Sequence, residues 1–425
     1  MKGRTFVALV CFSIGAFSSP TEGASSLSGA SPQASALQHA RSLLKTTILV
    51  DGHNDLPWEI RTKAGSDLQR YDLSKTTAGQ TDLARLRAGG IGAQFWSVYI
   101  PGEAAAVKGM AKTQLEQIDL ARRMIQLYPD ELSFVSDSKG IELAHQEGRI
   151  ASLLGMEGGH AIENSLGTLR AYYALGVRYM TLTHNATLDW ADSAMDVERH
   201  HGLTPFGKEV VHEMNRMGML VDVSHVSAEV MRDALANTEA PLIFSHSGAD
   251  AITHHPRNVP DDVLKAVSKN GGIVMVPFVT GFVSQKYADW SMPLWYGLLK
   301  NVTDPKEEER ITKAYTQEHP EPTVTLSEVA DHIDYIRKVS GVDHVGIGSD
   351  FDGGGGNIEG LEDVSKYPNL FAELIRRGWS DEDLRKLAGG NLLRVMRQSE
   401  AIARRLQKTR PPSTATIEQL DDKEF

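Results

Sequence analysis

The chain has 425 residues, of which 41% are hydrophobic and 23% are charged, a composition typical of a globular protein large enough for one barrel or two smaller domains. Its formal net charge of −11 argues against a nucleic-acid-binding protein, because such proteins carry clustered basic residues. We therefore expect no nucleic-acid partner.

The first 24 residues have the order of a secretory signal peptide. Lys2 and Arg4 precede an apolar stretch over residues 6–17, and small and polar residues follow it. The apolar stretch is too short to span a bilayer comfortably. The sequence thus predicts a signal peptide over residues 1–24 and a secreted or periplasmic protein; a buried or disordered N-terminus is the alternative.

The only cysteine, Cys11, lies inside this segment, so the mature protein would contain neither a thiol nor a disulfide. Val10 stands before it where a lipoprotein signal requires a small residue. No later segment has 18 uninterrupted apolar residues, and the last residues are polar. We expect no lipid anchor and no transmembrane helix.

Residues 25–44 are predicted to form a flexible linker and a short lead-in helix over 36–45. From 45 to 407, short apolar runs alternate with amphipathic stretches of helical period, which is typical of β-α units around a parallel sheet. Eight strands are predicted, the number of a (β/α)8 TIM barrel. They are residues 47–51, 91–99, 150–156, 177–183, 220–224, 241–245, 271–278 and 344–349. The helices between them are predicted over residues 82–88, 112–128, 165–175, 205–217, 227–235, 260–268 and 326–339.

Two segments stand outside this rhythm. Residues 284–322, after the seventh strand, form a long insertion that contains Trp290, Trp295 and Tyr296. A loop of this length usually has a function, and a lid or an oligomer contact is expected. Residues 408–425 are predicted to be a disordered polar tail.

Histidines and acidic residues end several of the predicted strands. In a parallel barrel these carboxyl ends meet on one face, where catalytic residues lie. The residues in question are His53, Asp55, Glu157, His184, His225, His246 and Asp350. Burying so many ionisable groups without compensation would cost many kcal/mol, and metal ions supply that compensation.

Imidazole nitrogens and carboxylate oxygens suit Zn²⁺, and the two oxygens of one glutamate can bridge two ions. The set divides into two half-sites that share Glu157: His53 and Asp55 on one ion, and His225 and His246 on the other. Taken singly, each strand-end histidine could be a hydrogen-bonded structural residue, and Glu157 could be an ion-paired barrel residue.

Over roughly residues 45–400 the chain resembles the membrane dipeptidase (renal dipeptidase) family of zinc metallopeptidases, within the amidohydrolase-type barrels. The motifs that carry the resemblance are Asp51-Gly52-His53-Asn54-Asp55-Leu56-Pro57, Gly155-Met156-Glu157-Gly158, Thr181-Leu182-Thr183-His184-Asn185, Asp222-Val223-Ser224-His225, Ser245-His246-Ser247, Pro256-Arg257-Asn258 and Gly348-Ser349-Asp350-Phe351-Asp352-Gly353. Other amidohydrolase barrels typically begin with His-x-His and often use a carboxylated lysine as bridge. This chain has an aspartate and a glutamate at those positions.

The resemblance implies a binuclear zinc centre with His53, Asp55, Glu157, His225 and His246 as ligands. It also implies that His184 contacts the scissile carbonyl oxygen, that Arg257 binds the substrate's carboxylate, and that Asp350 carries the proton in transit. Structural readings remain open for two of these residues. Arg257 could be a solvated loop arginine, and Asp350 could cap a helix or form a structural ion pair.

The sequence therefore predicts an exported zinc dipeptidase that hydrolyses dipeptides through a hydroxide bridging two zinc ions. Within enzymes, the alternative is a related barrel amidohydrolase that acts on a β-lactam or an N-acyl amino acid. From another class, the alternative is an exported binding protein without turnover. The expected partners are small dipeptides, and the resemblance also implies a homodimer.

Overall fold

The structure is a computed structural model that describes residues 32–102, 109–300, 302 and 304–421. The predicted signal peptide and most of the predicted linker lie outside these residues. The lead-in helix is α1 (Pro32–Leu44), which begins four residues earlier than predicted. Within the described residues, no helix combines the length and the apolar character needed to cross a bilayer.

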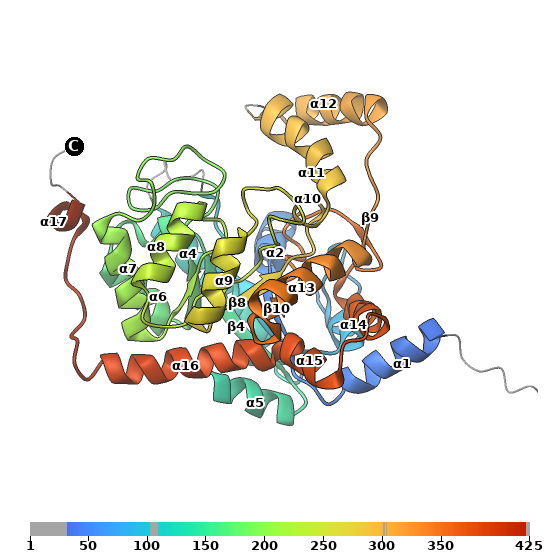
Figure 1. The fold of residues 1–425 in the computed structure, drawn as a ribbon, viewed down its shortest axis with the longest axis horizontal. Coiled ribbons are helices and arrows are strands. Elements are labelled where there is room, and N and C mark those ends of the chain that lie inside the picture. Colours follow the sequence, from blue (N-terminus) through green and yellow to red (C-terminus); the bar gives the residue numbers. More distant parts are fainter. Residues whose placement is uncertain (1–31, 103–108, 301, 303, 422–425) are drawn as a thin grey trace, which may run out of the picture.

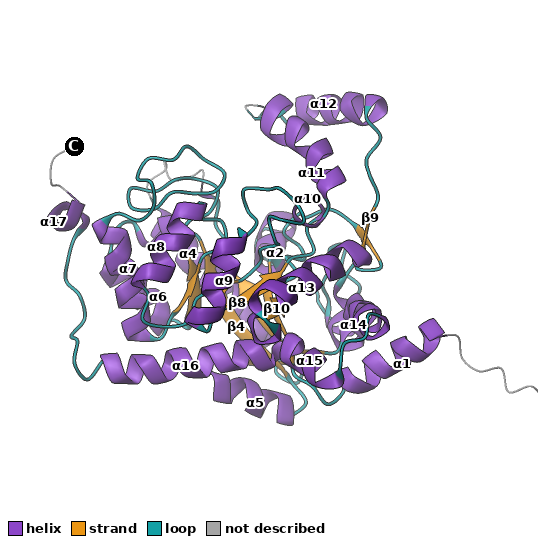
Figure 2. Ribbon diagram, viewed as in Figure 1, coloured by secondary structure: helices purple, strands orange, loops and turns teal. Residues whose placement is uncertain are grey.

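Eight parallel strands follow one another around a nearly closed barrel, which confirms the predicted fold. Figures 1 and 2 show strands at the centre of the molecule with helices around them. In order around the sheet they are β1 (Leu49–Asn54), β2 (Ile91–Ser97), β4 (Ile150–Glu157), β5 (Val177–Thr181), β6 (Leu220–Asp222), β7 (Ile243–Phe244), β8 (Ile273–Val276) and β10 (Val345–Ile347). A short additional strand, β3 (Leu132–Phe134), pairs with β4 and was not predicted.

The chain after β10 closes the barrel against β1. The amide of Asp350 donates to the carbonyl of His53 at 3.1 Å, and the amide of Asp55 donates to the carbonyl of Phe351 at 2.8 Å. These two bonds join the carboxyl ends of the first and last strands. They therefore bring two predicted site residues from opposite ends of the sequence together.

Strands β6 and β7 are shorter than predicted because the buried carboxylate of Asp222 replaces part of the ladder between them. Asp222, the last residue of β6, accepts hydrogen bonds from the backbone amides of Ser224 at 3.1 Å and Ser245 at 2.9 Å. Strand β6 therefore ends at Asp222 and strand β7 ends at Phe244. His225 and His246 stand in the loops that begin there.

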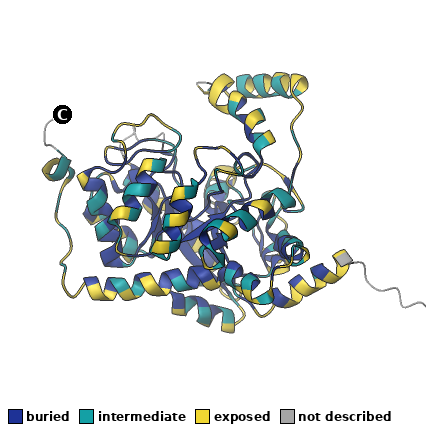
Figure 3. Cartoon of the chain, in the orientation of Figure 1, coloured by how far each residue is buried: buried dark blue, intermediate teal, exposed yellow. Residues whose placement is uncertain are grey.

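Helices cover the outside of the barrel (Figure 1). They are α2 (Leu56–Ala64), α3 (Leu83–Gly89), α4 (Met110–Leu127), α5 (Ser138–Gln146), α6 (Leu166–Ala174), α7 (Pro205–Met217), α8 (Ala228–Asn237), α9 (Asp261–Asn270), α13 (Leu326–Ser340), α14 (Tyr367–Arg376), α15 (Asp381–Arg385) and α16 (Asn391–Leu406). Their inner faces are buried and their outer faces exposed, as Figure 3 shows. Helix α7 begins after Thr204, its N-cap, and ends at Gly218, which has the left-handed conformation.

The barrel interior is filled by side chains from its strands, among them Phe95, Leu153, Tyr179 and Met275. Residues of α16 join the same cluster and cover one end of the barrel, opposite α11 (Gln285–Met292) and α12 (Pro305–Glu318) in Figure 1. The interior is therefore a packed core, and the open end for a ligand is the carboxyl end of the strands.

The carboxy-terminal tail differs from its prediction. The Arg170 guanidinium donates to the carbonyl of Ser413 at 2.9 Å, and the Asp421 carboxylate accepts from the Thr204 hydroxyl at 2.7 Å. Asp421 lies in a short helix, α17 (Ile417–Asp421), at the start of α7. The prediction of disorder is wrong for residues 408–421 because composition does not reveal these long-range hydrogen bonds.

Candidate metal centre and substrate cleft

The predicted site residues meet at the carboxyl ends of the strands. His53 lies in β1 with Asp55 just after it, Glu157 ends β4, and His184 follows β5. The loops after β6, β7 and β10 supply His225, His246 and Asp350. Three groups of these side chains bring their ligand atoms within 4.8 Å of one another: His53, Glu157 and His246; Glu157, His184 and His225; and His53, Asp55 and Asp350.

Glu157 lies at the centre of this cluster. Its Oε1 is 2.8 Å from Nε2 of His225 and 3.4 Å from Nε2 of His246. Its Oε2 is 3.4 Å from Nε2 of His53, which is itself 3.2 Å from Oδ2 of Asp55. Each oxygen of one carboxylate thus faces a different set of imidazoles, which is the arrangement of a binuclear metal site with a shared bridge.

Hydrogen bonds to the far nitrogens decide which imidazole atoms face the cluster. Ser245 donates its hydroxyl proton to Asp222 at 2.5 Å, so it accepts from Nδ1–H of His246 at 2.8 Å. The amide oxygen of Asn185 accepts from Nδ1–H of His225 at 3.2 Å. Burial lowers the pKa of both rings well below the usual value, so each ring is neutral and has no proton at Nε2, yet these two atoms lie 2.9 Å apart. Two lone pairs at this separation repel each other unless a cation lies between them and the carboxylate.

His53 is held in the same way from within the barrel. The Tyr179 hydroxyl donates to the carbonyl of Gly52 at 3.2 Å and accepts from Nδ1–H of His53 at 2.8 Å. Its Nε2 therefore faces the carboxylates of Asp55 and Glu157. A Cβ at Gly155 would lie 2.0 Å from the Tyr179 ring, so only glycine lets this tyrosine cross the barrel to reach His53.

The electrostatics of the cluster favour bound positive charge. Burial acts to lower the pKa of His53, but Tyr179 and the carboxylates of Asp55 and Glu157 together raise it well above its usual range. Burial acts to raise the pKa of Glu157, but His53, His225 and His246 hold it well below its usual range. The surroundings of His53 thus attract a cation, which can be a proton or a metal ion. The donor set fits the predicted metal.

Two of these residues have strained backbone conformations. His225 has a φ of 67° and Asp350 a φ of 66°, in the left-handed region that non-glycine residues rarely adopt. Such strain costs about 1–3 kcal/mol per residue and persists where the surroundings hold it, often at functional sites. Here the carbonyl of His225 accepts from the amide of Ala194 at 2.8 Å, and that of Asp350 from the amide of Gly353 at 3.2 Å.

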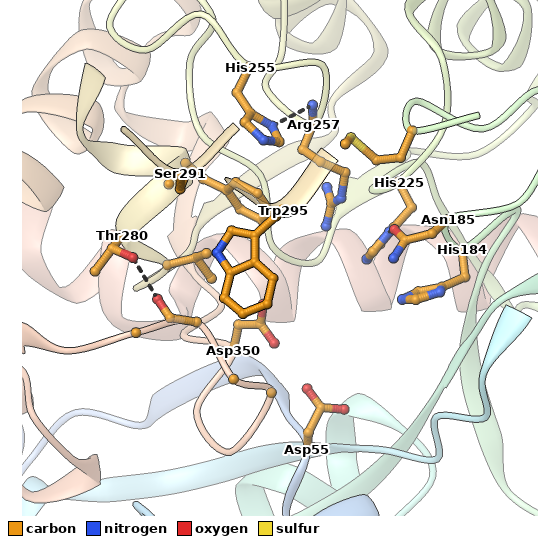
Figure 4. Close-up of a pocket in the computed structure, with 18 of the residues that line it drawn as sticks. Asp55, His184, Asn185, His225, His255, Arg257, Thr280, Ser291, Trp295 and Asp350 are labelled. Atoms are coloured by element: carbon orange, nitrogen blue, oxygen red, sulfur yellow. Dashed lines mark hydrogen bonds between the residues drawn. The ribbon is translucent and has the colours of Figure 1, made fainter. Parts of the chain in front are cut away.

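A cleft of about 600 Å³ opens beside the cluster, and Arg257 lines it (Figure 4). The Arg257 side chain is only 1% exposed, and none of its three nitrogen atoms has a hydrogen-bond partner among the described residues. Its guanidinium packs over the Phe282 ring at 4.9 Å. Because it is buried, Arg257 is not a solvated loop residue. A buried cation without a hydrogen-bond partner is costly, so this position favours an anionic ligand.

The loop that carries Arg257 is held by its neighbour Asn258. The Asn258 amide oxygen accepts from the amide of Gly248 at 2.9 Å. Its nitrogen donates at 2.8 Å to the carbonyls of both Thr253 and Phe282. The backbone amide of Arg257 donates to Nδ1 of His255 at 3.1 Å, so the backbone is fixed while the guanidinium has no hydrogen-bond partner among the described residues.

His184 is in contact with the cluster and with the cleft wall. Its Nε2 lies 3.9 Å from Oε1 of Glu157, and its ring centroid is 4.4 Å from that of His225 and 4.9 Å from that of Tyr99. Asp350 lies on the other side, with Oδ1 at 4.0 Å from Nε2 of His53. Burial, with Asp55 and Glu157 nearby, raises the pKa of Asp350 well above its usual range.

Sequence reasoning missed the residues that hold the predicted ligands, namely Tyr179, Asn185 and Ser245. Two of them adjoin a site histidine in sequence, since Asn185 follows His184 and Ser245 precedes His246. A polar residue next to a site histidine could therefore have been predicted to hold a ligand. Nothing in the sequence marks Tyr179, because its hydroxyl reaches His53 across the barrel.

Comparison with known proteins decides the family. A sequence profile of the membrane dipeptidase family (peptidase family M19) matches residues 37–410. The chain belongs to this family. It is 44% identical to dipeptidase 3 of Rattus norvegicus over 371 residues, which cover 86% of this chain and 68% of that protein. The chain is therefore a metallo-dipeptidase of peptidase family M19, as the motifs predict.

Solved structures share the fold of this M19 dipeptidase. The probable dipeptidase PvdM from Pseudomonas aeruginosa is 26% identical, with a TM-score of 0.76 over 87% of this chain and 99% of that one. A metallopeptidase from Rhodobacter sphaeroides, solved with a phosphinate mimic of the dipeptide L-Ala-D-Ala, is 23% identical, with a TM-score of 0.68 over 83% and 99%. The buried histidine and carboxylate cluster of this chain lies within the matched barrel.

Proposed function

We propose that this enzyme hydrolyses the peptide bond of dipeptides through a hydroxide that bridges two zinc ions. One observation carries the proposal: the cleft that opens on the Glu157 cluster also contains Arg257, a buried cation without a hydrogen-bond partner in the described structure. A substrate that fits both features has a carboxylate a short distance from a hydrolysable bond. A dipeptide has this form.

The donor atoms indicate which residues would hold the metal. His53 and Asp55 would bind one ion and His225 and His246 the other, with Glu157 bridging them, and nitrogen and oxygen donors of this kind suit zinc. Bound zinc would polarise the scissile carbonyl and make hydroxide available near neutral pH. His184 belongs to the cluster and also lines the cleft, so it would contact the substrate as well.

The remaining residues supply hydrogen bonds and proton transfer. His184, held between His225 and Tyr99, donates to the oxyanion as it develops. Asp350 would accept the proton of the attacking hydroxide and deliver it to the leaving amine. Arg257 pairs with the terminal carboxylate by a forked contact. The dipeptide mimic bound by the Rhodobacter sphaeroides relative supports the substrate class.

A substrate panel tests this function. Purified protein would be assayed on dipeptides, tripeptides, N-acyl amino acids and a β-lactam, before and after chelation and after zinc is restored, with metal content measured per chain. We expect turnover of dipeptides, loss on chelation and recovery with zinc at two ions per chain. Tripeptides hydrolysed as fast as dipeptides would contradict the role of Arg257, and turnover of N-acyl amino acids alone would favour the related amidohydrolase.

The variant His246→Ala tests the ligand set. We expect it to lose one metal ion per chain and at least about 1,000-fold of turnover, because the second half-site would keep only His225 and the bridge. His212→Ala on the surface of α7, where the side chain is 36% exposed, is the matched control and should keep both. Full activity in His246→Ala would refute the assignment.

We also propose that the chain is exported by its first 24 residues and acts in the periplasm or outside the cell. The order of charged, apolar and small residues supports this proposal. Expression of the full chain in a bacterial host, followed by fractionation and N-terminal sequencing, tests it. A mature protein that begins between residues 17 and 25 is expected, and an intact Met1 in the cytoplasm would contradict export.

A further inference from the structure

The insertion after β8 reaches the substrate cleft. We name residues 284–322 the arm; it contains α11, a six-residue π-helix (Pro293–Leu298) and α12. In Figure 1 the arm rises from the barrel beside α10 (Thr280–Val283) and carries α12 away from the body of the molecule. π-helical turns are rare and are frequent at functional sites. The barrel closes without the arm, so its position needs another explanation.

The base of the arm is fixed to the barrel. Ala288, Ser291 and Leu294 are buried, and the side chain of Gln285 accepts from the amide of His254 at 2.7 Å. That hydrogen bond ties the arm to the loop that carries Arg257. The position of the π-helix is therefore set relative to the predicted carboxylate-binding group.

The two limbs of the arm are fixed to each other as well. The Trp290 indole donates to the carbonyl of His319 at 2.8 Å, and the Tyr315 hydroxyl donates to the carbonyl of Trp290 at 2.8 Å. The rings of Trp290 and Tyr315 pack with centroids 5.7 Å apart. These contacts hold the segments before and after the π-helix against each other.

Those side chains are large, apolar and exposed. Among the described residues only seven large hydrophobic side chains are highly exposed, and three of them, Trp295 (46%), Tyr296 (45%) and Leu298 (54%), lie on the π-helix. Trp295 and Tyr296 line the cleft, whereas Leu298 does not. In Figure 4 the Trp295 indole projects into the cleft between Thr280 and Arg257, over Asp350. Exposed aromatic rings at a cleft wall are typical of a ligand-binding surface.

We propose that Trp295, supported by Tyr296, forms the wall that binds the side chain of the substrate's carboxyl-terminal residue and selects apolar and aromatic side chains there. This inference deepens the proposed function and rests on it, because Arg257 locates the substrate's carboxylate. The carboxyl-terminal side chain branches from the carbon that bears this carboxylate. It therefore lies beside the arm, on the same side of the cleft as Phe282.

Electrostatics and a second aromatic pair support this orientation. Burial lowers the pKa of Arg257, and Tyr296 is among the groups near enough to act against that shift. A different pair, Trp58 and Tyr99, packs with ring centroids 5.1 Å apart, and Tyr99 contacts His184. This second pair lines the cleft beside His184. The wall formed by Trp295 and Tyr296 would thus contact the carboxyl-terminal residue of the dipeptide, and the wall formed by Trp58 and Tyr99 the amino-terminal residue.

Ratios of kcat/KM test the proposal. Wild type and Trp295→Ala would be assayed on alanyl-phenylalanine and alanyl-glycine, and on phenylalanyl-glycine as the amino-terminal counterpart. We expect wild type to prefer alanyl-phenylalanine over alanyl-glycine, and the variant to lose about 10-fold of that ratio, because a well-packed aromatic contact gives discrimination of this order. The ratio of phenylalanyl-glycine to alanyl-glycine should not change.

Leu298→Ala is the matched control, since it removes another exposed apolar side chain from the same π-helix outside the cleft, and it should keep the wild-type ratios. Trp295→Phe should retain most of the preference. An unchanged ratio of alanyl-phenylalanine to alanyl-glycine in Trp295→Ala, or a change confined to phenylalanyl-glycine, would overturn this inference. Either result would leave the proposed function standing. A wild type inert on all three dipeptides, with zinc bound, would overturn the proposed function and this inference with it.

Discussion

At the scale of single residues, each of three predicted ligand histidines presents Nε2 to the cluster because another group binds its Nδ1. That group is Tyr179 for His53, Asn185 for His225 and Ser245 for His246. With Nδ1 occupied, Nε2 is the nitrogen that each ring offers to a metal. The holding groups come from different strands and loops, so the barrel as a whole prepares the site.

The variant Arg257→Met separates binding from stability. Removing the cation should raise KM and lower kcat/KM for dipeptides by about 100-fold, because a charge-assisted contact to the substrate is lost. The free energy of unfolding should stay the same or rise, because a buried cation without a hydrogen-bond partner in the described structure is replaced by an apolar side chain. Steady-state kinetics and denaturant unfolding measure the two effects. Arg232→Met, on exposed α8, is the control, and an unchanged KM in Arg257→Met would contradict the role.

At the scale of elements, helix α13 supports the loop between β7 and α9, on which Arg257 lies. His332 of α13 is buried and accepts at Nδ1 from the amide of Ala249 at 2.9 Å. Its Nε2 lies 3.3 Å from the hydroxyl of Thr253. Only the neutral imidazole can accept this bond, and burial lowers the pKa of His332 to about 4.

This lowered pKa predicts a loss of stability in acid. Between pH 6.5 and about 4 the unfolded chain binds a proton at His332 that the folded chain does not, so the free energy of unfolding falls as pH falls, by at most about 3 kcal/mol from this residue. Above pH 6.5 it contributes no pH dependence. Urea unfolding of His332→Asn should show a shallower decline between pH 7 and 4.5, whereas His212→Asn should follow wild type. Parallel curves for His332→Asn and wild type would disprove this.

At the scale of the whole molecule, the carboxy-terminal segment joins regions that are distant in sequence. After α16 covers one end of the barrel, residues 408–421 run to the start of α7. Arg170 of α6 binds Ser413 on the way, and Asp421 accepts from the Thr204 hydroxyl and from the amide of Phe206 at 2.8 Å. The segment therefore stabilises α7, far from the cleft.

The variant Asp421→Ala should lower the free energy of unfolding by about 1 kcal/mol, because two hydrogen bonds at the amino-terminal end of α7 are lost. We expect kcat/KM to stay at the wild-type value. Chemical denaturation and dipeptide assays measure these quantities. Glu418→Ala removes an exposed carboxylate from the same short helix and should leave stability unchanged. Equal stability of Asp421→Ala and wild type would show that the contact contributes nothing.

The sequence alone predicted the barrel and the residues that gather at its open end. The rhythm of apolar runs located all eight barrel strands, because burial on both faces of a parallel sheet imposes that pattern locally. Motifs such as His53-Asn54-Asp55 and Ser245-His246 stand at strand ends, and parallel strands bring these ends to one face. Short stretches of sequence therefore suffice to predict which residues form the cluster.

Only the tertiary structure decided what depends on contacts between distant residues. Tyr179 reaching His53 across the barrel, the arm placing Trp295 over the cleft, and Asp421 binding at α7 all join residues far apart in sequence. The same holds for the buried, unpaired state of Arg257. Local periodicity and composition report which face of an element is apolar, but the partner that a polar or aromatic side chain meets is set when the elements pack together.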